Sequence, residues 1–576
     1  MWVRYPRTSH LPWSPGATAD DVRLADLSGL VGREVVVTGK LDGENTTLYR
    51  DGLHARSLDS AHHPSRAWVK ALHGAVSGLI PVGWRVCGEN LYARHSLAYD
   101  DLDSWFYAFS VWAGDRCLDW DETVRFTRRL GVPVPPVLWR GVFDERALRA
   151  LRLDPSRQEG YVVRTVDGFD RAEFPGRVAK WVRAGHVRTD RHWMSAPVVP
   201  NGRGAAGALW DVRAGLPVDV PALLAAVGMA GSAEGSGAAA GAVAAGGAEA
   251  LARLDLADRR GDARLVGVLA TLLHRVPRPL LRLAGPLGVP LARRVADVVA
   301  LHRLLHRGIP DAERRAGLVR LSVAADLGVL HAVAAAVASE TEERDQVAWS
   351  ALHAEEAGLL GEDPLGHLRS GLREALAGFD AEVGDRCWAH AREAFGAGRV
   401  TTAEEAVAAT WRWRAGGFPR LIVLSGPAGA GKSTFARTLP GVEVVSLDDL
   451  REARGSRSDQ RANGEVLRTG LRRLDEALAR GASVVWDATS LDRRQRAVVL
   501  DVADRHGALV THAVLVVDEE TVARRNAARE HRVPAEVVAA QLARFSPPCA
   551  GEAHRTWYVG RDGAVADVAG ALDGEA

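Results

Sequence analysis

The stretch LIVLSGPAGAGKSTFARTL, residues 421–439, contains the most specific local pattern in the chain. Its apolar start is typical of a buried strand and its end is typical of a helix. Between them GPAGAGKST, residues 426–434, fits the pattern GxxxxGK[ST]. Glycines let the backbone curl so that its N–H groups surround a phosphate at a helix N-terminus. The stretch therefore predicts a phosphate-binding loop between a strand and a helix.

Several residues of this loop have expected tasks. Lys432 would reach the β- and γ-phosphate oxygens of a nucleotide, and the Ser433 hydroxyl can ligate Mg²⁺. The predicted nucleotide-binding set is completed by Gly426, Gly431 and Thr434.

Residues 416–576, which surround this loop, alternate buried-strand runs with helical stretches. The apolar runs are RLIVLSG, VEVVSLDD, ASVVWDAT and ALVTHAVLVVD. This alternation predicts an α/β P-loop domain in which helices cover both faces of a parallel sheet.

Charged residues follow the later strands of this domain. We expect Asp448 at the carboxyl end of the strand beside the phosphate-loop strand, where it can accept a hydroxyl proton while Arg451 holds an anionic group. Asp487 ends the next strand. Arg525 and Arg529 lie one helical turn apart, so they can close over a phosphoryl group of the substrate. Each of these residues alone is also typical of a solvated loop charge.

The order of four elements, GPAGAGKST, DDLR, DATSLDRR and RRNAAR, resembles the T4-type 5′-polynucleotide kinase family over residues 419–550. The resemblance implies that Asp448 is the general base for a polynucleotide 5′-OH and that Arg451 contacts the adjacent phosphate. It also implies that Asp487 lies on the acceptor side and that Arg529 is the lid arginine on the transferring phosphate. A small-molecule P-loop kinase, which shares the first half of the pattern, is the alternative.

Residues 1–205 contain most of the tryptophan and tyrosine, in short β-like runs that predict an α+β domain rich in antiparallel strands. KLDGEN, residues 40–45, directly follows one such run. Lysine is scarce: Lys and Arg together number 73, but lysine occurs only at positions 40, 70, 180 and 432. A biased genome composition explains the scarcity. Because lysine, unlike arginine, can lose its proton, Lys40 is a candidate nucleophile for the α-phosphate of ATP.

Four further residues complete a set suited to nucleotidyl transfer. Phe109 offers an aromatic face for a purine, and Glu89 offers an acid for a ribose hydroxyl. Glu159 offers an acid for a metal ion, and Lys180 offers a cation for the triphosphate. Taken singly, each is equally typical of an ordinary strand or core residue, but their joint order on predicted strand ends favours a nucleotide site.

This set resembles motifs I, III, IIIa, IV and V of the covalent nucleotidyltransferases, and KLDGEN and GENLYARHSL look like an ATP-dependent RNA ligase. The resemblance implies an ATP-grasp-like ligase domain that uses ATP with Mg²⁺ or Mn²⁺. It implies that Lys40 carries the adenylate as lysyl-AMP and that Lys180 contacts the α-phosphate. It further implies that Glu89 contacts the ribose, Phe109 stacks on adenine and Glu159 binds the metal. The nucleotide-binding residues that it adds are Asp42, Gly43, Asn45 and Arg56.

One position departs from the family pattern. Motif V often has two basic residues spaced as KxK, whereas Val182 fills the second place here. Arg177 and Arg183 are both candidates for the missing cation. The OB domain expected behind a DNA ligase core is not evident in the sequence.

Two segments of different composition separate the predicted enzymatic domains. Residues 206–249 are rich in Ala and Gly, which is typical of a flexible linker. Residues 250–415 have apolar residues at helical spacing and predict an all-helical module of unknown role. His302 and His306 are a candidate metal pair there, but the arginines beside them favour a structural connector or an RNA-binding module. No phosphatase motif is evident, so removal of a 3′-phosphate would belong to a separate protein or to a domain that the sequence does not reveal.

Bulk features set the remaining expectations. The 73 basic and 72 acidic residues nearly cancel, which excludes a uniformly basic nucleic-acid coat. The four cysteines are scattered, and the first thirty residues lack the apolar core of a signal peptide. We therefore expect a cytoplasmic protein without a membrane span.

The two resemblances together predict a multidomain, bifunctional RNA repair enzyme. Its kinase would phosphorylate 5′-OH ends, and its ligase would activate the 5′-phosphate as AppRNA and join it to a 3′-OH. The alternative is an RNA-end binding or sensing protein whose nucleotide sites regulate rather than turn over.

Overall fold

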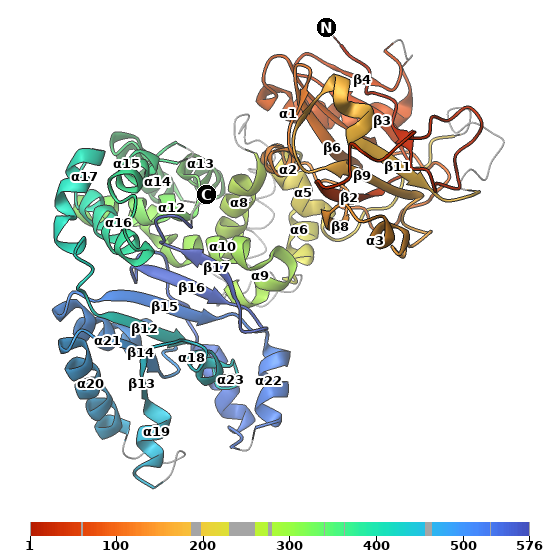
Figure 1. The fold of residues 1–576 in the computed structure, drawn as a ribbon. Helices are drawn as coiled ribbons and strands as arrows, with labels where there is room; N and C mark the ends of the chain where they lie inside the picture. Colours follow the sequence, from red (N-terminus) through yellow and green to blue (C-terminus); the bar gives the residue numbers. More distant parts are fainter. Residues whose placement is uncertain are drawn as a thin grey trace. The chain divides into compact units, whose positions relative to one another are not determined.

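The computed structural model describes residues 2–58, 62–185, 197–229, 260–274, 279–338, 340–361, 363–455, 463–529 and 531–574. The chain divides into two compact units, Met1–Leu265 and Val266–Ala576. Figure 1 shows two β-sheets in the first unit, and a helical region followed by one α/β sheet in the second.

The first unit is an α+β domain with two sheets. The five-stranded sheet has the order β1 (Ser9–His10), β11 (Val178–Val182), β9 (Gly160–Thr165), β2 (Glu34–Lys40), β8 (Val137–Val142). The six-stranded sheet has the order β10 (Phe169–Asp170), β7 (Arg116–Cys117), β6 (Phe106–Ala113), β5 (Trp84–Asn90), β3 (Glu44–Leu48), β4 (Leu53–Ala55). β1 pairs with β11 in parallel, and the other neighbouring strands of both sheets are antiparallel. The prediction of an antiparallel-rich domain is confirmed.

β2 is buried on both faces, which explains its run of valines. Val35 and Val37 pack in one core cluster with Tyr161 and Val163, whereas Val36 packs on the other side against Trp120. Because side chains alternate along a strand, this central strand points a fixed set of groups to each face. The helices of this unit are α1 (Ala67–Val76), α2 (Trp120–Leu130), α3 (Glu145–Arg149), α4 (Phe174–Arg177), α5 (Gly207–Ala214) and α6 (Val220–Ala226).

The start of the predicted linker 206–249 is not a linker. α5 and α6 occupy much of residues 207–226, and Ala214 and Leu216 join the core cluster that contains Leu48 and Val86. Burial of these apolar side chains stabilises the segment despite its high Ala and Gly content. Residues 230–249 of the predicted linker lie outside the described residues.

The middle of the chain is helical, as predicted. Its helices are α8 (Gly261–Leu273), α9 (Pro279–Leu287), α10 (Val289–Leu301), α11 (Arg303–His306), α12 (Asp311–Ala324), α13 (Leu327–Val337), α14 (Thr341–Glu356), α15 (Gly366–Ala375), α16 (Ala381–Gly396) and α17 (Ala403–Ala409). Among the described residues, no single helix has the length and apolar composition of a membrane span. α12 and α13, bent by 107°, pass that test only as a pair.

The α/β part of the second unit is built on a six-stranded sheet. The strand order is β13 (Glu443–Ser446), β14 (Ser483–Asp487), β12 (Arg420–Ser425), β15 (Leu509–Leu515), β16 (Arg555–Val559), β17 (Val565–Ala569). The first five strands are parallel, as predicted, and β17 is antiparallel to β16. The helices are α18 (Lys432–Ala436), α19 (Leu447–Glu452), α20 (Asn463–Ala479), α21 (Arg493–Arg505), α22 (Glu519–Ala527) and α23 (Ala535–Arg544).

Helices cover both faces of this sheet (Figure 1). Val423, Val484 and Trp486 pack with residues of α20 and α21, while their strand neighbours Ile422 and Val485 pack with residues of α18. This alternation accounts for the uninterrupted apolar runs in the sequence, since a strand covered on both sides needs apolar residues throughout.

The helical region joins the α/β part in one compact unit. Arg555 at the start of β16 forms ion pairs with Asp385 (2.8 Å) and Glu382 (2.7 Å) of α16. Arg293 of α10 pairs with Asp567 of β17 at 2.7 Å. The helices thus pack beside the β16–β17 edge of the sheet.

Candidate active sites

Lys40 lies at the end of β2, where the chain leaves one sheet of the first unit for the other. The KLDG turn, residues 40–43, leads directly into β3. A Cβ on Gly43 would lie 2.5 Å from the Asn90 carbonyl oxygen, so only glycine fits there. The Gly43 N–H donates to Glu89 Oε1 at 3.2 Å. The turn is therefore tied to the strand that carries Glu89.

Asp42 anchors the same turn to the segment after β5. Its Oδ2 accepts a hydrogen bond from the Leu97 N–H at 2.9 Å, and its own N–H donates to the Tyr99 hydroxyl at 2.8 Å. Burial and the nearby Glu159 carboxylate raise the pKa of Asp42. Asp42 thus holds the shape of the turn that presents Lys40.

Lys40 forms an ion pair with Glu159, which precedes β9 and is 7% exposed. The backbone reinforces this pair, because the Glu159 N–H donates to the Lys40 carbonyl at 3.1 Å. Burial lowers the pKa of Lys40, but Glu159, Glu89 and Asp42 outweigh it and raise that pKa overall. The amine is therefore charged in this state and must separate from Glu159 and lose a proton before it attacks phosphorus.

The Glu89 carboxyl on β5 lies close to both members of this pair. Burial raises its pKa to about 7, even though the Lys40 charge lowers it. A carboxyl group that titrates near neutral pH can donate or accept a hydrogen bond, which suits a ribose hydroxyl.

Lys40 and Glu89 line a cavity of about 880 Å³, whereas Asp42 and Glu159 are not part of its lining. Lys180 on β11 also lines it, and burial followed by the Lys40 charge lowers the Lys180 pKa. Phe109 on β6 lines it too and meets Tyr5 edge-on, with ring centroids 5.1 Å apart. The structure therefore brings most of the predicted nucleotide residues of this unit, but not Asp42, to one cavity lining, which contains Lys40, Gly43, Asn45, Arg56, Glu89, Phe109 and Lys180.

Sequence reasoning missed two parts of this cavity wall. The N-terminal residues 4–8 line it, because β1 pairs beside β11. Arg66 also lines it and forms a buried ion pair with Glu44, with Arg66 Nε 2.8 Å from Glu44 Oε2. Neither part belongs to a motif, so no sequence signal could have found them.

The two candidates for the second motif V cation differ in their contacts. Arg177 pairs with Glu173 at 2.6 Å. Arg183 donates its backbone N–H to the Glu159 carbonyl at 3.1 Å, which ties it to the partner of Lys40. Neither side chain is part of the cavity lining.

The second site is the loop between β12 and α18. Gly426, Gly429 and Gly431 have φ values of +155°, +87° and +106°, which other residues rarely adopt. Lys432 Nζ donates to the carbonyls of Gly426 (2.9 Å) and Pro427 (2.8 Å). The lysine therefore folds back over the loop in which phosphates are expected.

Burial lowers the pKa of Lys432 to about 8. The Asp487 and Asp448 carboxylates raise this pKa, and Arg529 lowers it, so all three lie near the lysine. The predicted phosphate lysine, general base and lid arginine are thus gathered at one site. Thr434, two residues after Lys432 in α18, accepts a long hydrogen bond from Arg437 at 3.4 Å.

Two strand-end predictions need correction. β14, not β13, is the strand beside the phosphate-loop strand, so Asp448 follows the edge strand and Asp487 ends the adjacent one. The Asp487 carboxylate is hydrogen-bonded with Ser433, and burial raises its pKa. Asp487 therefore contacts Ser433, the predicted metal ligand, and its predicted place on the acceptor side stays a prediction.

Asp448 and Arg451 lie one turn apart on α19 and form an ion pair at 2.6 Å. The Asp448 side chain is 62% exposed, and Arg451 Nε also donates to Asn463 Oδ1 at 3.0 Å. The carboxylate predicted to act as a base is thus open to solvent and paired with the cation predicted to hold substrate.

Arg525 and Arg529 differ in their contacts and exposure. Arg525 on α22 donates to the phosphate-loop carbonyl of Ala430 at 3.1 Å and to the carbonyl of Arg561 in the β16–β17 turn. Arg529 lies beyond the end of α22, exposed but close enough to lower the pKa of Lys432. Arg525 therefore braces the loop, and only Arg529 fits the predicted lid.

The oxygen donors at both sites suit a hard divalent cation. Carboxylate and hydroxyl oxygens are ligands that Mg²⁺ prefers, and Glu159 and the Ser433–Asp487 pair supply them. Across the described residues, no cluster of three or more His, Cys, Asp or Glu side chains forms a metal site of its own. His302 and His306, the predicted pair in the helical region, instead hydrogen-bond each other at 2.9 Å.

Two family models match the chain. Residues 33–182 match the model described as RNA ligase, and residues 421–548 match the model described as AAA domain. The chain therefore combines an N-terminal RNA ligase domain with a C-terminal, kinase-like P-loop domain. No curated protein sequence matches it.

Several solved structures are similar to parts of this chain. A chain of the Pnkp1/Rnl/Hen1 RNA repair complex is 23% identical, with 22% of this chain and 44% of that chain covered and a TM-score of 0.21. A mutant Naegleria gruberi RNA ligase with ATP and Mn is 18% identical, with 27% and 52% covered and a TM-score of 0.21. A sugar kinase from Janibacter sp. is 23% identical, with 25% and 86% covered and a TM-score of 0.21. The chain thus spans about half or less of the RNA repair and RNA ligase chains that it matches.

Proposed function

We propose that the first unit is an ATP-dependent RNA ligase that works through a lysyl-AMP intermediate. The observation that carries the proposal is the placement of Lys40 at a strand end, in one cavity with Glu89, Phe109 and Lys180 and in contact with Glu159. These groups provide a nucleophile, a ribose contact, an aromatic surface and a second cation within one nucleotide-sized space.

The proposed ligation takes three steps. Lys40 Nζ loses its proton and forms a P–N bond with the α-phosphate of ATP, and pyrophosphate leaves. A 5′-phosphate oxygen of RNA then attacks the same phosphorus, which breaks the P–N bond and yields AppRNA. Finally a 3′-OH loses its proton and attacks the 5′-phosphate of AppRNA, and AMP leaves.

The surrounding residues prepare Lys40 for the first step. Lys180 would contact the α-phosphate and offset its charge as the P–N bond forms. Glu159 would hold Mg²⁺ or Mn²⁺, and such an ion supplies positive charge to the triphosphate. Once Glu159 is engaged elsewhere, the carboxylate that most strongly raises the pKa of Lys40 is removed, which favours loss of its proton.

We infer that the P-loop domain phosphorylates 5′-OH ends of polynucleotides. Lys432 and Arg529 would bind the transferring phosphate, and Ser433 beside Asp487 would hold Mg²⁺. Asp448 would take the proton of the 5′-OH as its oxygen attacks the γ-phosphate and ADP leaves. Because Arg451 pairs with Asp448, an acceptor phosphate that binds Arg451 would release the carboxylate for this task.

The two activities form a sequence. The kinase product, a 5′-phosphate end, is the ligase substrate, so one chain would repair breaks that carry a 5′-OH and a 3′-OH. Breaks that carry a 3′-phosphate would need a separate 3′-end phosphatase first.

The ligase proposal is tested by sealing of a nicked RNA stem-loop with a 5′-phosphate and a 3′-OH. We expect Lys40→Ala to abolish sealing and Lys70→Ala to leave it unchanged, because Lys70 is an exposed lysine of α1 outside the cavity. Equal sealing by wild type and Lys40→Ala would contradict the assignment of the nucleophile. Absence of sealing by wild type would favour an RNA-end sensor.

The kinase proposal is tested by transfer of γ-labelled phosphate from ATP to a 5′-OH RNA. Lys432→Ala and Asp448→Asn should abolish transfer, whereas Asp501→Asn, an exposed acid of α21, should not change it. Labelling of a sugar such as gluconate with none of RNA would identify a small-molecule kinase and contradict the proposal.

A further inference from the structure

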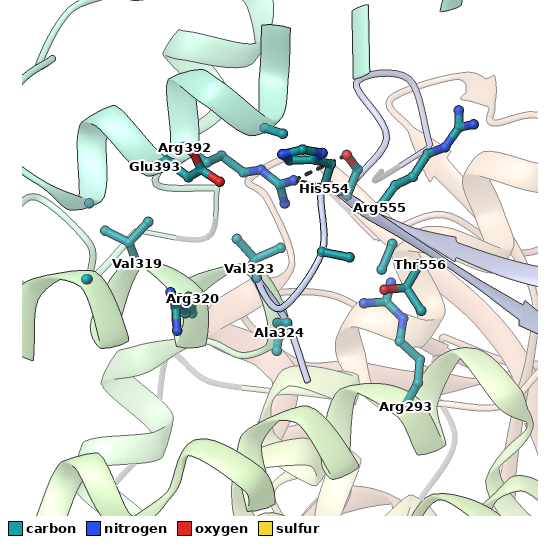
Figure 2. Close-up of a pocket in the computed structure, with 18 of the residues that line it drawn as sticks. Arg293, Val319, Arg320, Val323, Ala324, Arg392, Glu393, His554, Arg555 and Thr556 are labelled. Carbon is teal, nitrogen blue, oxygen red and sulfur yellow. Dashed lines mark hydrogen bonds between the residues drawn. The ribbon is translucent and has the colours of Figure 1, made fainter. Parts of the chain in front are cut away.

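A cavity of about 220 Å³ lies in the second unit, where the helical region meets the β16–β17 edge (Figure 2). Two of its arginines are engaged by the protein itself: Arg392 donates to the His554 carbonyl, as Figure 2 shows, and Arg555 is bound to carboxylates of α16. This cavity is smaller than common ligand pockets, which measure about 300–1,000 Å³. The cavity of the first unit, with about 880 Å³, falls within that range, and the roles proposed above leave its N-terminal wall, residues 4–8, unused.

Residues 2–10, which we call the strap, connect the two sheets of the first unit along one wall of this larger cavity. Near the start of the strap, Tyr5 meets Phe109 of the six-stranded sheet edge-on, with ring centroids 5.1 Å apart. At its end, His10 lies opposite Lys180 of the five-stranded sheet in the β1–β11 pairing. Phe109 is the proposed adenine contact and Lys180 the proposed α-phosphate contact. The strap therefore runs from the adenine end of the proposed nucleotide site to its phosphate end.

Hydrogen bonds fix the strap near both of its ends. The Tyr49 hydroxyl accepts a hydrogen bond from the Val3 N–H at 2.7 Å and donates one to the Val3 carbonyl at 3.1 Å. Just after the strap, the Leu11 N–H donates to the Lys180 carbonyl at 2.8 Å. Because both ends are anchored, the residues between them are held at the cavity wall.

Most cations of this cavity lining already have a partner or a proposed role. Arg66 is bound to Glu44, and Arg164 donates to a backbone carbonyl at 2.8 Å, so both stabilise the fold. Arg4 and Arg7 of the strap have no proposed role. The other cations of the lining belong to the proposed nucleotide site and are Lys40, Arg56 and Lys180.

Arg7 lies at the phosphate end of the proposed site. Its Nη2 donates to the Asp20 carbonyl at 2.7 Å and lies 3.5 Å from Asp21 Oδ1. Asp21 also lines the cavity. Burial lowers the pKa of Lys180 and the Asp21 charge opposes this effect, so the Asp21 carboxylate is close to that lysine. Asp21 thus places Arg7 beside the proposed α-phosphate contact, whereas Arg4 is three residues nearer to the adenine end.

The contact between Arg7 and Asp21 can be exchanged for a phosphate at low cost. At 3.5 Å it is longer than a typical hydrogen bond, and the Arg7 side chain is exposed. Exposed ion pairs of this kind contribute little to stability. A guanidinium can bind two phosphate oxygens at once, which makes a stronger contact.

We propose that Arg7 binds the β- and γ-phosphates of ATP and the pyrophosphate that they become, an inference that rests on the proposed ligase function. As Lys40 Nζ bonds to the α-phosphorus, the bond from that phosphorus to the oxygen bridging to the β-phosphate breaks, and pyrophosphate leaves with the electron pair. Arg7 offsets the charge that develops on this leaving group. Arg7 therefore acts in adenylylation and in its reversal, but not in the sealing of AppRNA, in which pyrophosphate takes no part.

The test compares the two reactions that involve pyrophosphate with the one that does not. For Arg7→Gln, the ATP and pyrophosphate concentrations that give half-maximal AMP transfer to and from Lys40 should rise about tenfold, as for loss of a charged hydrogen bond. Sealing of preformed AppRNA to a 3′-OH strand without ATP should match that of wild type. Arg33→Gln is the matched control and should change none of the three, because Arg33 is also exposed, is paired with Asp167 at 4.0 Å and lies outside the cavity lining.

A second variant separates binding of phosphate from support of the strap. Asp21→Asn removes the carboxylate that holds Arg7 but leaves the arginine available to phosphate. If Arg7 binds phosphate, this variant should need no more ATP than wild type at pH 7. If Arg7 only supports the strap, Asp21→Asn should resemble Arg7→Gln, and both variants should also slow the sealing of AppRNA.

Binding without turnover provides a further measurement. In Lys40→Ala, ATP should slow hydrogen–deuterium exchange of a peptide covering residues 2–10 more than AMP does, because AMP lacks the phosphates that Arg7 holds. Equal protection of this peptide by ATP and AMP would overturn the inference. An unchanged ATP requirement in Arg7→Gln, or a loss of AppRNA sealing in that variant, would overturn it as well.

Failure of this inference can be told apart from failure of the proposed function. An AMP adduct in wild type, combined with equal protection of residues 2–10 by ATP and AMP, would contradict only the role of Arg7. Absence of the adduct in wild type, combined with stronger protection of the strap by ATP than by AMP, would contradict only the ligase proposal.

Discussion

At the residue scale, burial and the Glu159 carboxylate act in opposite directions on the pKa of Lys40, and the carboxylates together outweigh burial. Among the neighbouring carboxylates, Glu159 raises the pKa of Lys40 most, and it is also the expected metal ligand. The Glu159 carboxylate therefore favours the charged form of the Lys40 amine. This effect would be lost once a metal ion or another group binds Glu159.

A first prediction concerns this pair. Glu159→Gln removes the negative charge beside Lys40, so the ammonium form loses stabilisation and the pKa of Lys40 falls. The pKa can be measured from the pH dependence of Lys40 labelling by an amine-reactive reagent, followed by peptide mass spectrometry. Lys70 in the same digest is the internal control and should not shift. An unchanged or higher Lys40 pKa in the variant would contradict the assignment.

A second prediction concerns Lys432, whose pKa burial lowers to about 8 in the free protein. Because the charged amine binds phosphate, kcat/KM of the kinase for ATP should fall as pH rises through 8, by about tenfold per pH unit. Below that pH the lysine is charged and this contribution is constant. A profile that is flat from pH 7 to 9.5 would show that the charge of Lys432 does not limit ATP capture.

A third prediction concerns the turn that presents Lys40. Gly43→Ala places a Cβ 2.5 Å from the Asn90 carbonyl oxygen, so the turn must shift. We expect sealing activity to fall, and unfolding of the first unit to become easier by about 1–3 kcal/mol. Gly74→Ala is the matched control: it lies in α1 with nothing within 4 Å of the new Cβ, so it should stabilise the helix by about 0.5–1 kcal/mol. Equal behaviour of the two variants in calorimetry would refute the steric argument.

At the element scale, sequence patterns predicted where strands and helices occur along the chain. They predicted less well which strands lie next to each other in the sheet. The apolar runs of β12 and β14 and the loop between β12 and α18 could be recognised because local spacing encodes them. The order β13, β14, β12 could not, because a crossover places the second strand in sequence at the sheet edge. For this reason Asp487 ends the strand next to the phosphate-loop strand, whereas Asp448 follows the edge strand.

The same limit applies to Arg525. Its i, i+4 spacing with Arg529 suggested a two-arginine lid, but the fold brings the turn of the β16–β17 hairpin against α22. Arg525 thereby connects that hairpin turn to Ala430 of the phosphate loop. Its position depends on a contact 36 residues away in the chain, which no local pattern encodes.

A fourth prediction follows from this contact. Arg525→Met removes both hydrogen bonds while keeping the aliphatic length, so the phosphate loop should lose support. We expect KM for ATP in the kinase assay to rise about tenfold, as for the loss of a charged hydrogen bond. Arg524→Met is the control, because Arg524 donates to Thr521 of its own helix and not to the loop. Equal KM values for the two variants would show that Arg525 does not brace the loop.

At the scale of the whole molecule, the helical region is part of the P-loop unit rather than a free connector. Sequence composition identified it as helical but could not reveal its partner. The contacts that attach it, Arg555 with Asp385 and Arg293 with Asp567, join residues that are 170 and 274 positions apart. Because the chain has so many arginines, the sequence does not show which arginine forms an ion pair with which carboxylate.

A fifth prediction tests this attachment. Asp385→Asn breaks a buried ion pair and leaves Arg555 with one fewer carboxylate. Removal of one partner of a buried pair costs about 3–5 kcal/mol, so the thermal transition of the second unit should move down. Limited proteolysis should show faster cleavage of the helical region and the sheet together, with the first unit unaffected. If the sheet resists as well as in wild type, the helices are not needed for its stability.

In the first unit, sequence motifs predicted many of the residues that line the cavity. The residues that motif order predicts to bind nucleotide include seven that the structure gathers in one cavity lining. The wall formed by residues 4–8 could not be predicted, since it depends on the parallel pairing of β1 with β11. Motif order thus predicted the residues that are proposed to carry the chemistry. Long-range strand pairing determines how the cavity around them is closed.

The most direct measurement of the central claim is the mass of the protein after incubation with ATP and Mg²⁺. We expect that wild type gains one AMP, that peptide mapping places it on Lys40, and that pyrophosphate reverses the reaction. Lys70→Ala should behave like wild type, and Lys40→Ala should gain nothing. Absence of the adduct in wild type, or an adduct that maps to another lysine, would contradict the account.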